Sequence, residues 1–292
     1  MKNKTTILVT TDFSTNSRAG IRFAIQLASQ MPCKLVFYHA IELLIPTIWS
    51  SEKAAQFAKT EIERSKEQLG QFLKDIYKQA KMPANEYEYA VEMGVDVDNS
   101  IINYAQKMKV DYICMSTRGA GVVKKLIGTN ASRLVNTSSI PVIVVPQNYR
   151  IKPITKVGYS SDFENIDKEL SIVKAFTASL EAKIDVYHFQ YQFSEANSKD
   201  VFKGIIDKYQ SEQLAFHIPK LYLDYSLVEN LQQTLKKHKP SILIMFTKQK
   251  QNWFERFIFD SKTADMTYNI KIPLLAIYEC TPSVKSTFFD QK

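Results

Sequence analysis

The sequence predicts an α/β fold built from two tandem doubly wound units, each a parallel five-stranded sheet with helices on both faces. Short apolar runs alternate with longer amphipathic stretches, as strands and helices do in such a sheet. Runs such as KLVFYHAI at 34–41 and PVIVVP at 141–146 are apolar at nearly every position. Strands buried on both faces require this composition. The whole pattern begins again near residue 151, so we expect two copies of one fold.

The first unit is expected to hold five strands and four helices. Strands are short runs rich in β-branched and aromatic residues, and helices carry apolar residues three and four positions apart. Residues 17–30, for example, place Ile21, Ala24, Ile25 and Ala28 at helical spacing. In chain order, the expected elements are a strand at 7–11, a helix at 17–30, a strand at 34–41, a helix at 52–81, a strand at 86–91, a helix at 98–108, a strand at 111–116, a helix at 129–137 and a strand at 141–146.

The second unit repeats the first. KIDVYHFQ echoes KLVFYHAI, SILIMFTKQK echoes DYICMSTRGA, and NIKIPLLAIY echoes TSSIPVIVVP. This alignment places Asp162 at the position of Asp12 and His188 at the position of His39. The expected boundaries are a first domain at 1–147, a linker QNYRIKP at 147–153, a second domain at 151–280 and a C-terminal tail at 281–292.

The last strand of each unit, VIVV or LLAI, would be an exposed apolar edge. Such an edge presents unpaired backbone groups and promotes association. Pairing the two edges with each other would cover both, so we predict that the units pack as an intramolecular pseudo-dimer. Further self-association into a homo-oligomer is left open.

Composition bounds the partners of the chain. The 292 residues are 45% hydrophobic and 23% charged, which is typical of globular proteins. The net charge of +8 is spread along the chain and interleaved with acids, so we expect a solvated surface rather than a nucleic-acid site. The start MKNKTTILVTTDF does not resemble a secretory signal, and no window approaches the ~18 apolar residues of a membrane span. We therefore expect a cytoplasmic protein without a membrane partner.

Cysteine and histidine spacing argues against metal and nucleophile chemistry. Cys33, Cys114 and Cys280 lie far apart in apolar contexts, which is typical of reduced core thiols. The four histidines are also scattered along the sequence, which makes a metal site or a catalytic triad improbable. His39 and His188 recur in both units without a catalytic partner, so we interpret them as structural.

The loop STRGAGVVKKLIGT at 116–129 is the candidate anion site. Gly119, Gly121 and Gly128 would let backbone N–H groups approach a phosphate, and Thr129 would open a helix whose N-terminus carries about half a positive charge. Lys124 and Lys125 could screen the phosphate charge. The loop is neither a Walker A motif nor GxGxxG, so a plain strand-to-helix connection is the alternative.

The order and spacing of several segments resemble the universal stress protein family. They are ILVTTDFS, KLVFYHAIE, VEMGVDVDNSIINYAQKMKVDYICMSTRG and IPVIVVP. The resemblance covers nearly all of residues 5–146, and the repeat extends it more faintly to about residue 280. It implies a Rossmann-like fold of the adenine nucleotide alpha hydrolase type, and an ATP or other adenine nucleotide as ligand, with Mg²⁺ only if ATP is bound.

The ATP-binding branch of that family has a GxxG pattern, nine residues and then G[ST] in this loop. This chain departs from it twice, because Ser116 stands at the first glycine position and only eight residues, 120–127, separate Gly119 from Gly128. The shortened loop puts the phosphate contacts most in question. By position, the resemblance implies as nucleotide-binding residues Asp12, Ala40, Met115, Ser116, Gly119, Gly128, Thr129 and Asn130.

The corresponding loop of the second unit, TKQKQNWFERFIFDS at 247–261, has lost its glycines. Lys250 and Asp260 stand in their places, and the carboxylate would repel a phosphate. We predict no nucleotide in the second unit, and interpret Trp253, Phe254 and Phe257 as helix-packing or partner surface. Because Asp162 persists in this degenerate unit, Asp12 has two open interpretations: a ligand contact, or a group that satisfies free N–H groups before the first helix.

The region of the loop offers no catalytic group, since no histidine or glutamate lies between 111 and 146. We therefore expect a non-enzymatic stress-response protein, in which a nucleotide orders the loop and signals to an unidentified protein partner. Two alternatives remain: a nucleotide-free scaffold of the same fold, and, ranked lower, a slow ATP-hydrolysing enzyme.

Overall fold

The computed structural model of the chain describes residues 4–82, 86–94, 96–117, 129–189, 197–209, 211–219, 221–222, 224–225, 227–247 and 271–278. The first half contains β1 (Thr5–Thr10), α1 (Arg18–Gln30), β2 (Cys33–Ile41), α2 (Ser51–Ala80), β3 (Tyr87–Met93), α3 (Val97–Lys107), β4 (Tyr112–Ser116), α4 (Thr129–Thr137) and β5 (Val142–Val145). The second half contains β6 (Lys156–Ser160), α5 (Ile166–Thr177), β7 (Lys183–Tyr187), α6 (Asn197–Tyr209), β8 (Leu214–His217), α7 (Leu227–His238), β9 (Ile242–Thr247) and β10 (Leu274–Tyr278).

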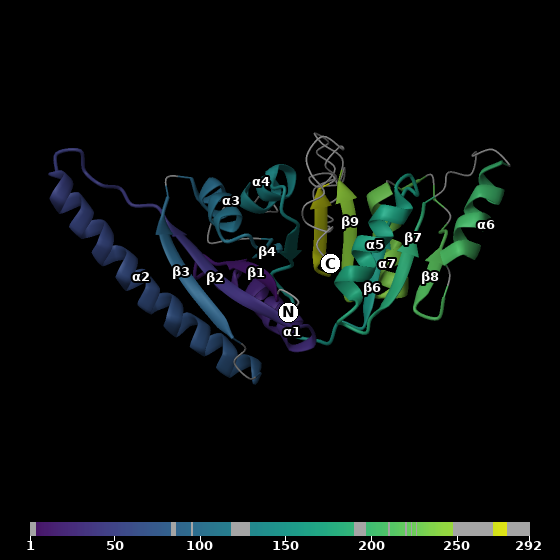
Figure 1. Cartoon of the computed structure of the whole chain (residues 1–292), viewed down its shortest axis with the longest axis horizontal. Helices are drawn as coiled ribbons and strands as arrows, with labels where there is room; N and C mark the ends of the chain where they lie inside the picture. The colour runs from purple at the N-terminus through teal and green to yellow at the C-terminus, as the bar shows by residue number, and fades with distance from the viewer. Residues whose placement is uncertain are drawn as a thin grey trace.

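The strands form one sheet of ten in the order β3-β2-β1-β4-β5-β10-β9-β6-β7-β8. Each half therefore has the same order, with its first strand next to its fourth, and all pairs within a half are parallel. The predicted doubly wound α/β class is confirmed. Figure 1 shows the two halves side by side along the sheet, with helices on both of its faces.

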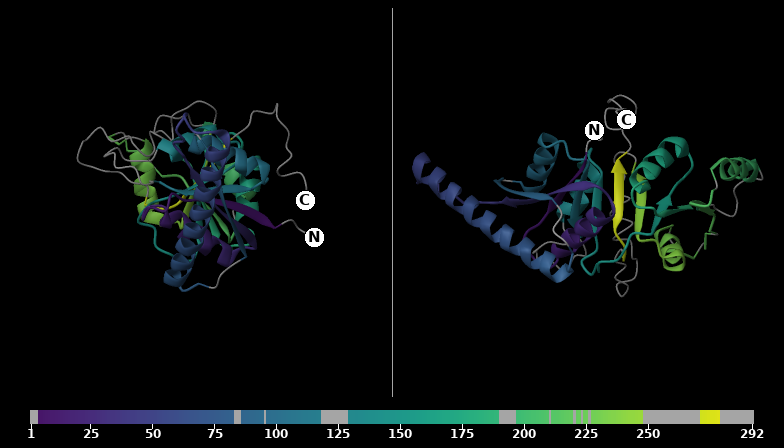
Figure 2. Two further views of the ribbon diagram at one scale, coloured as in Figure 1. Left: turned by 90° about the vertical axis from the view of Figure 1, so that its left-hand side faces the viewer. Right: turned by 60° about the horizontal axis from the view of Figure 1, so that its bottom comes forward.

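The halves join through their last strands, as the edge argument predicts. Strand β10 pairs antiparallel with β5, with Leu274 opposite Val144, Leu275 opposite Ile143 and Ala276 opposite Val142. In Figure 2 the yellow β10 stands between the two halves. The pairing gives each edge strand a neighbour on both sides, which removes the exposed apolar edges.

Side chains from alternate strand positions fill two cores, one on each face of the sheet. Cys114 of β4 packs with α1, whereas its neighbour Ile113 packs with α3 and α4. The first core continues under α2 and α5 into the second half, and the other continues under α7. Burial on both faces explains why the central strands are apolar at consecutive positions.

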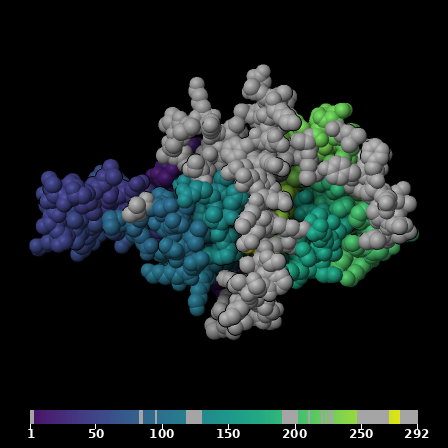
Figure 3. Space-filling view, turned by 90° about the horizontal axis from the view of Figure 1, so that it is seen from above, coloured from purple at the N-terminus to yellow at the C-terminus, as the bar shows by residue number. Residues whose placement is uncertain are grey.

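Helix α2 is the longest element, with 30 residues. Its N-cap Ser50 accepts a hydrogen bond from the backbone N–H of Lys53, and it ends at Lys81, which is left-handed at φ 52°. Leu69, Leu73 and Ile76 anchor its C-terminal half in the core. Its N-terminal part protrudes from the rest of the molecule, at the left in the space-filling view of Figure 3.

The repeat extends to unusual backbone conformations. Phe13 and Phe163, which follow the two equivalent aspartates, have φ of 62° and 71°. Lys109 and Lys239, which follow α3 and α7, have φ of 50° and 51°. Positive φ is uncommon for residues other than glycine, so these matched positions support the alignment of the two halves residue by residue.

Candidate functional site

The strand order makes neighbours of the strands that carry four of the sequence-predicted site residues. Strand β1 pairs with β2 on one side and β4 on the other, so the strand order reverses between β1 and β4. In open α/β sheets ligands bind beyond the carboxyl ends of the strands at such a point. Asp12 follows β1, Ala40 lies near the end of β2, and Met115 and Ser116 end β4. Strands β1 and β4 are neighbours, which is the condition for Asp12 to lie close to the exit of β4.

Asp12 has a structural role in the turn after β1. Its Oδ1 accepts a hydrogen bond of 3.0 Å from the backbone N–H of Ser14. Asp162 does the same in the second half, where its Oδ1 accepts from Glu164 N at 2.9 Å. The aspartate thus satisfies an N–H of the turn, four residues before α1 begins at Arg18. This shared hydrogen bond explains why both halves keep an aspartate here, whether or not a ligand binds.

Hydroxyl groups complete this turn. Thr11 Oγ1 accepts a hydrogen bond from Phe13 N at 3.1 Å and lies 2.8 Å from Ser17 Oγ. Ser14 Oγ accepts from Ser17 N at 3.1 Å. These bonds hold Phe13 in its left-handed conformation and fix the approach of the chain to α1.

Ser116 is bonded to the first turn of α1. Its Oγ accepts a hydrogen bond of 2.8 Å from Gly20 N and donates one of 3.2 Å to Ser17 O, and the side chain is 7% exposed. Ser17, the N-cap residue of α1, makes no side-chain capping bond, so Ser116 supplies the cap from β4. Sequence analysis missed this role, because the two residues lie 96 positions apart.

Gly20 permits this contact. A Cβ at Gly20 would lie 3.1 Å from the carbonyl carbon of Met115 and 3.2 Å from the nitrogen of Ser116. A side chain here would therefore push α1 away from β4. A glycine in place of Ser116 would leave Gly20 N without this acceptor.

Fewer contacts are described for the remaining predicted residues. Ala40 is half-buried and Met115 is buried, and both pack on the face covered by α3 and α4. Thr129 and Asn130 open α4. Gly119, Gly121, Gly128, Lys124 and Lys125 lie outside the described residues, as does the corresponding loop of the second half except Thr247.

The two equivalent histidines are structural, as predicted. His39 Nδ1 lies 2.7 Å from Thr11 O, and His188 Nδ1 lies 3.0 Å from Ser161 O. Each ring packs 4.2 Å from the phenylalanine that follows the aspartate, Phe13 or Phe163. Burial lowers the pKa of both histidines, against the opposing effects of the backbone hydrogen bond and the nearby aspartate.

Two of the three cysteines are buried free thiols, as predicted. They are Cys33 and Cys114, and burial raises the pKa of Cys33 to about 11 and that of Cys114 further. Both are therefore protonated and unreactive near neutral pH. Cys280 lies outside the described residues.

Comparison with known proteins adds to this geometry. The family described as "Universal stress protein family" matches residues 4–146. Residues 4–146 are a universal stress protein domain. A universal stress protein of Methanocaldococcus jannaschii, MJ0531, is 26% identical over 144 residues, which are 48% of this chain and 80% of that protein.

Solved structures of universal stress proteins share the fold over nearly the whole chain. A universal stress protein from Archaeoglobus fulgidus has a TM-score of 0.67 and 14% identity, covering 94% of this chain and 99% of its own. A putative one from Pseudomonas aeruginosa has a TM-score of 0.59 and 12% identity, covering 94% of each chain. At these identities the likeness concerns the fold alone.

The second half differs from the universal stress protein domain where its own strand order reverses. The first turn of α1 contains no acidic residue, whereas that of α5 contains Asp167 and Glu169. Glu169 is 5% exposed, and its Oε2 accepts a hydrogen bond from the Tyr159 hydroxyl. Ser161 Oγ lies 2.8 Å from the same hydroxyl. This buried carboxyl group makes the second half less suited to an anion.

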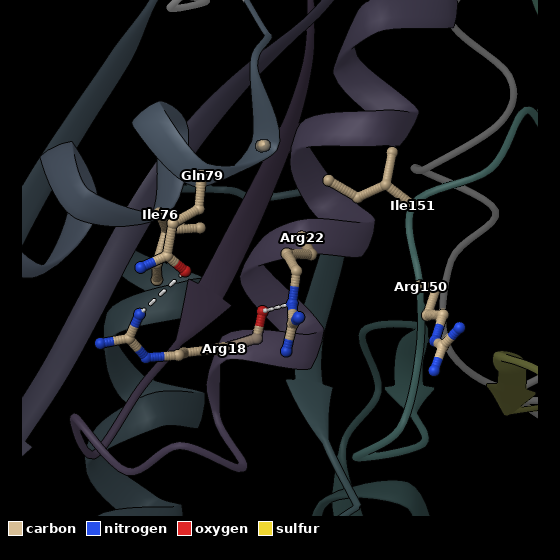
Figure 4. Close-up of a pocket in the computed structure, with 7 residues that line it drawn as sticks. Arg18, Arg22, Ile76, Gln79, Arg150 and Ile151 are labelled. Atoms are coloured by element: carbon tan, nitrogen blue, oxygen red, sulfur yellow. Dashed lines mark hydrogen bonds between the residues drawn. The ribbon is translucent and has the colours of Figure 1, made fainter.

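A basic hollow lies between α1, the C-terminal end of α2 and the segment that follows the universal stress protein domain at 150–151. Arg18, Arg22 and Arg150 line a cavity of about 230 Å³ (Figure 4). Arg18 donates to Gln79 Oε1 at 3.4 Å and stacks 4.6 Å from the Phe72 ring. Burial, and then the charge of Arg18, lowers the pKa of Arg22. This cavity contains none of the sequence-predicted site residues.

His217 and His238 are distant in the sequence but lie together in the structure, contrary to what their spacing led us to expect. Their ring centroids lie 4.1 Å apart in the second half, beside Asp185. Sequence analysis missed this cluster because the contact depends on how β7, β8 and α7 pack.

None of the helices in the described part of the chain is long and apolar enough to cross a membrane.

Proposed function

We propose that the universal stress protein domain at 4–146 binds an adenine nucleotide, ATP in the first instance, as a regulatory ligand. The observation that carries the proposal is the strand order, which gathers Asp12, Ala40 and Met115 at the carboxyl ends of three adjacent strands. The base and ribose would lie against these residues, with Asp12 accepting hydrogen bonds from the ribose. Thr129 and Asn130 at the start of α4 would face the phosphates, where a helix N-terminus favours an anion. Mg²⁺ would accompany ATP.

The second half is proposed to remain empty. The buried carboxyl group of Glu169 and the replacement of both loop glycines by Lys250 and Asp260 support this. The two halves would then have different tasks: one binds the ligand, and the other completes the sheet through β10. Nucleotide binding would order the loop after β4 and present it to a protein partner in the cytoplasm. The buried free thiols are consistent with a reducing compartment.

We propose no catalytic role for this site. His39, a candidate base on β2, is bonded to Thr11 O and packed on Phe13. General-base catalysis needs a group that can reach the attacking water. Phosphate release from ATP should therefore stay at the level of a control without protein. Faster phosphate release by the wild type that disappears in Asp12→Ala would contradict this part of the proposal.

The duplication provides a matched pair of variants to test binding. Asp12→Ala and Asp162→Ala each remove one equivalent hydrogen bond to a turn N–H, but only Asp12 lies at the proposed site. Calorimetric titration with ATP and Mg²⁺ should show binding by the wild type and by Asp162→Ala. For Asp12→Ala the loss of a charged hydrogen bond, about 1.5–3 kcal/mol, corresponds to roughly 10- to 150-fold weaker binding.

Two results would contradict the proposal. One is no binding by the wild type at millimolar ATP together with no nucleotide released on denaturing the purified protein. The other is equal affinity of the two variants. The first result would favour the scaffold alternative, which the capping role of Ser116 supports, because that hydroxyl is already bonded within the protein.

A further inference from the structure

A cluster of three metal-ligating side chains lies in the second half, away from the proposed nucleotide site. Asp185 lies on β7, His217 ends β8 and His238 ends α7. One ligand atom from each can be chosen so that all three lie within 4.8 Å of one another. The cluster occupies the sheet face that α7 covers, since Tyr187, two positions after Asp185, packs in the core on that face. Figure 1 shows the three elements next to each other.

The carboxylate of Asp185 is held on one side and open toward the histidines on the other. Its Oδ2 lies 3.4 Å from Lys156 Nζ and accepts a hydrogen bond of 3.3 Å from the Tyr187 hydroxyl. Its Oδ1 lies 3.1 Å from His217 Nε2. Asp185 is 6% exposed, so the two outer contacts fix the orientation of a buried carboxylate.

His217 has an unsatisfied nitrogen that points to a ligand. Within the described residues, its Nε2 is buried and has no hydrogen-bond partner despite its closeness to Asp185 Oδ1. Buried polar atoms without a partner are rare and destabilising in proteins. A metal ion between this nitrogen, Oδ1 and the ring of His238 would satisfy it.

The first half shows that the fold does not require these residues. In the alignment of KIDVYH with KLVFYH, Asp185 corresponds to Val36. His217 pairs with Tyr187 as Ala90 pairs with Tyr38, and His238 precedes the left-handed Lys239 as Met108 precedes Lys109. The universal stress protein domain thus fills the same positions with apolar residues. Burying a carboxylate beside two half-buried imidazoles instead costs stability unless a partner compensates.

We propose that Asp185, His217 and His238 bind a divalent transition-metal ion of the Zn²⁺ class. Two imidazoles and one carboxylate form a common ligand set for such ions, with water in the fourth position. Ligand atoms around Zn²⁺ lie roughly 3.3 Å apart, so small side-chain rotations would complete the site. The side chain of His217 is 27% exposed, which leaves a path for the ion.

The test uses the full chain, treated with a chelator and free of nucleotide. Titration with ZnCl₂ should show one ion bound per chain and raise the thermal unfolding midpoint. Co²⁺ in place of Zn²⁺ should give the visible absorption of a four-coordinate ion. His217→Ala and His238→Met introduce the residues of the first half, and each should weaken Zn²⁺ binding at least tenfold. Glu212→Gln, at an exposed acid before β8, is the control and should bind as the wild type does.

Loss of binding counts only for variants whose circular dichroism matches that of the metal-free wild type. The wild-type Co²⁺ spectrum tests the proposal even if neither histidine variant folds. Absence of Zn²⁺ binding by the wild type would overturn the proposal, as would unchanged affinity in both folded histidine variants or a Co²⁺ spectrum typical of six coordination.

Discussion

Replacement of Ser116 by alanine tests the capping role of this residue. The change removes the acceptor of Gly20 N and the donor to Ser17 O at a site that is 7% exposed. Because α1 covers the site, the N–H of Gly20 would stay buried without a partner. The cost of such a group is about 1–3 kcal/mol of the free energy of unfolding. Urea denaturation followed by circular dichroism should show a loss of this size with an unchanged slope.

Thr137→Ala is the control for this experiment. The Thr137 hydroxyl donates to Arg133 O within α4, but the side chain is exposed. Its removal should change the free energy of unfolding by less than about 0.5 kcal/mol. If Ser116→Ala were as stable as this control, the capping role would be refuted. If Ser116→Ala instead kept its stability and lost ATP affinity, the hydroxyl would belong to the ligand site rather than to α1.

Two further predictions concern stability. Leu275 is fully buried opposite Ile143 in the junction of β10 and β5. Leu275→Ala should therefore lower the free energy of unfolding by about 2–5 kcal/mol. Two separate unfolding transitions by calorimetry would indicate that the halves have lost their coupling. Burial lowers the pKa of His39 and His188, so the unfolded chain binds more protons below pH about 6.5, the ordinary histidine value. The stability that the two neutral histidines contribute is therefore complete above that pH. It is lost as the pH falls toward the pKa of each histidine in the folded chain. A urea midpoint that rises as the pH is lowered from 7 to 5.5 would contradict this.

The element pattern was predictable because the central strands and their covering helices carry strong local signals. The helix at 129–137 and the strand at 34–41 agree with the structure to within one residue. The prediction that the last strands pair followed from the apolar edge that each would otherwise expose. In contrast, α6, β8 and α7 were not assigned from the sequence. Strand β8 gives a weak signal because it has only four residues, of which only Leu214 is buried.

The site was predictable only as far as topology determines it. Asp12 could be placed at the reversal of strand order because its position after β1 is a local feature. The cap that Ser116 provides to α1 depends on the packing of two segments distant in sequence, made close by Gly20. The cluster around Asp185 likewise depends on the register of β7 with β8, in which Tyr187 lies opposite His217. No spacing in the sequence encodes either contact.

Native mass spectrometry of the full chain with ATP and Mg²⁺ tests most directly whether one half alone of this duplicated fold holds a nucleotide. The account predicts a single adenine nucleotide per chain, bound as tightly by Asp162→Ala and roughly 10- to 150-fold more weakly by Asp12→Ala. Two nucleotides bound with similar affinity, or none at millimolar ATP, would contradict it.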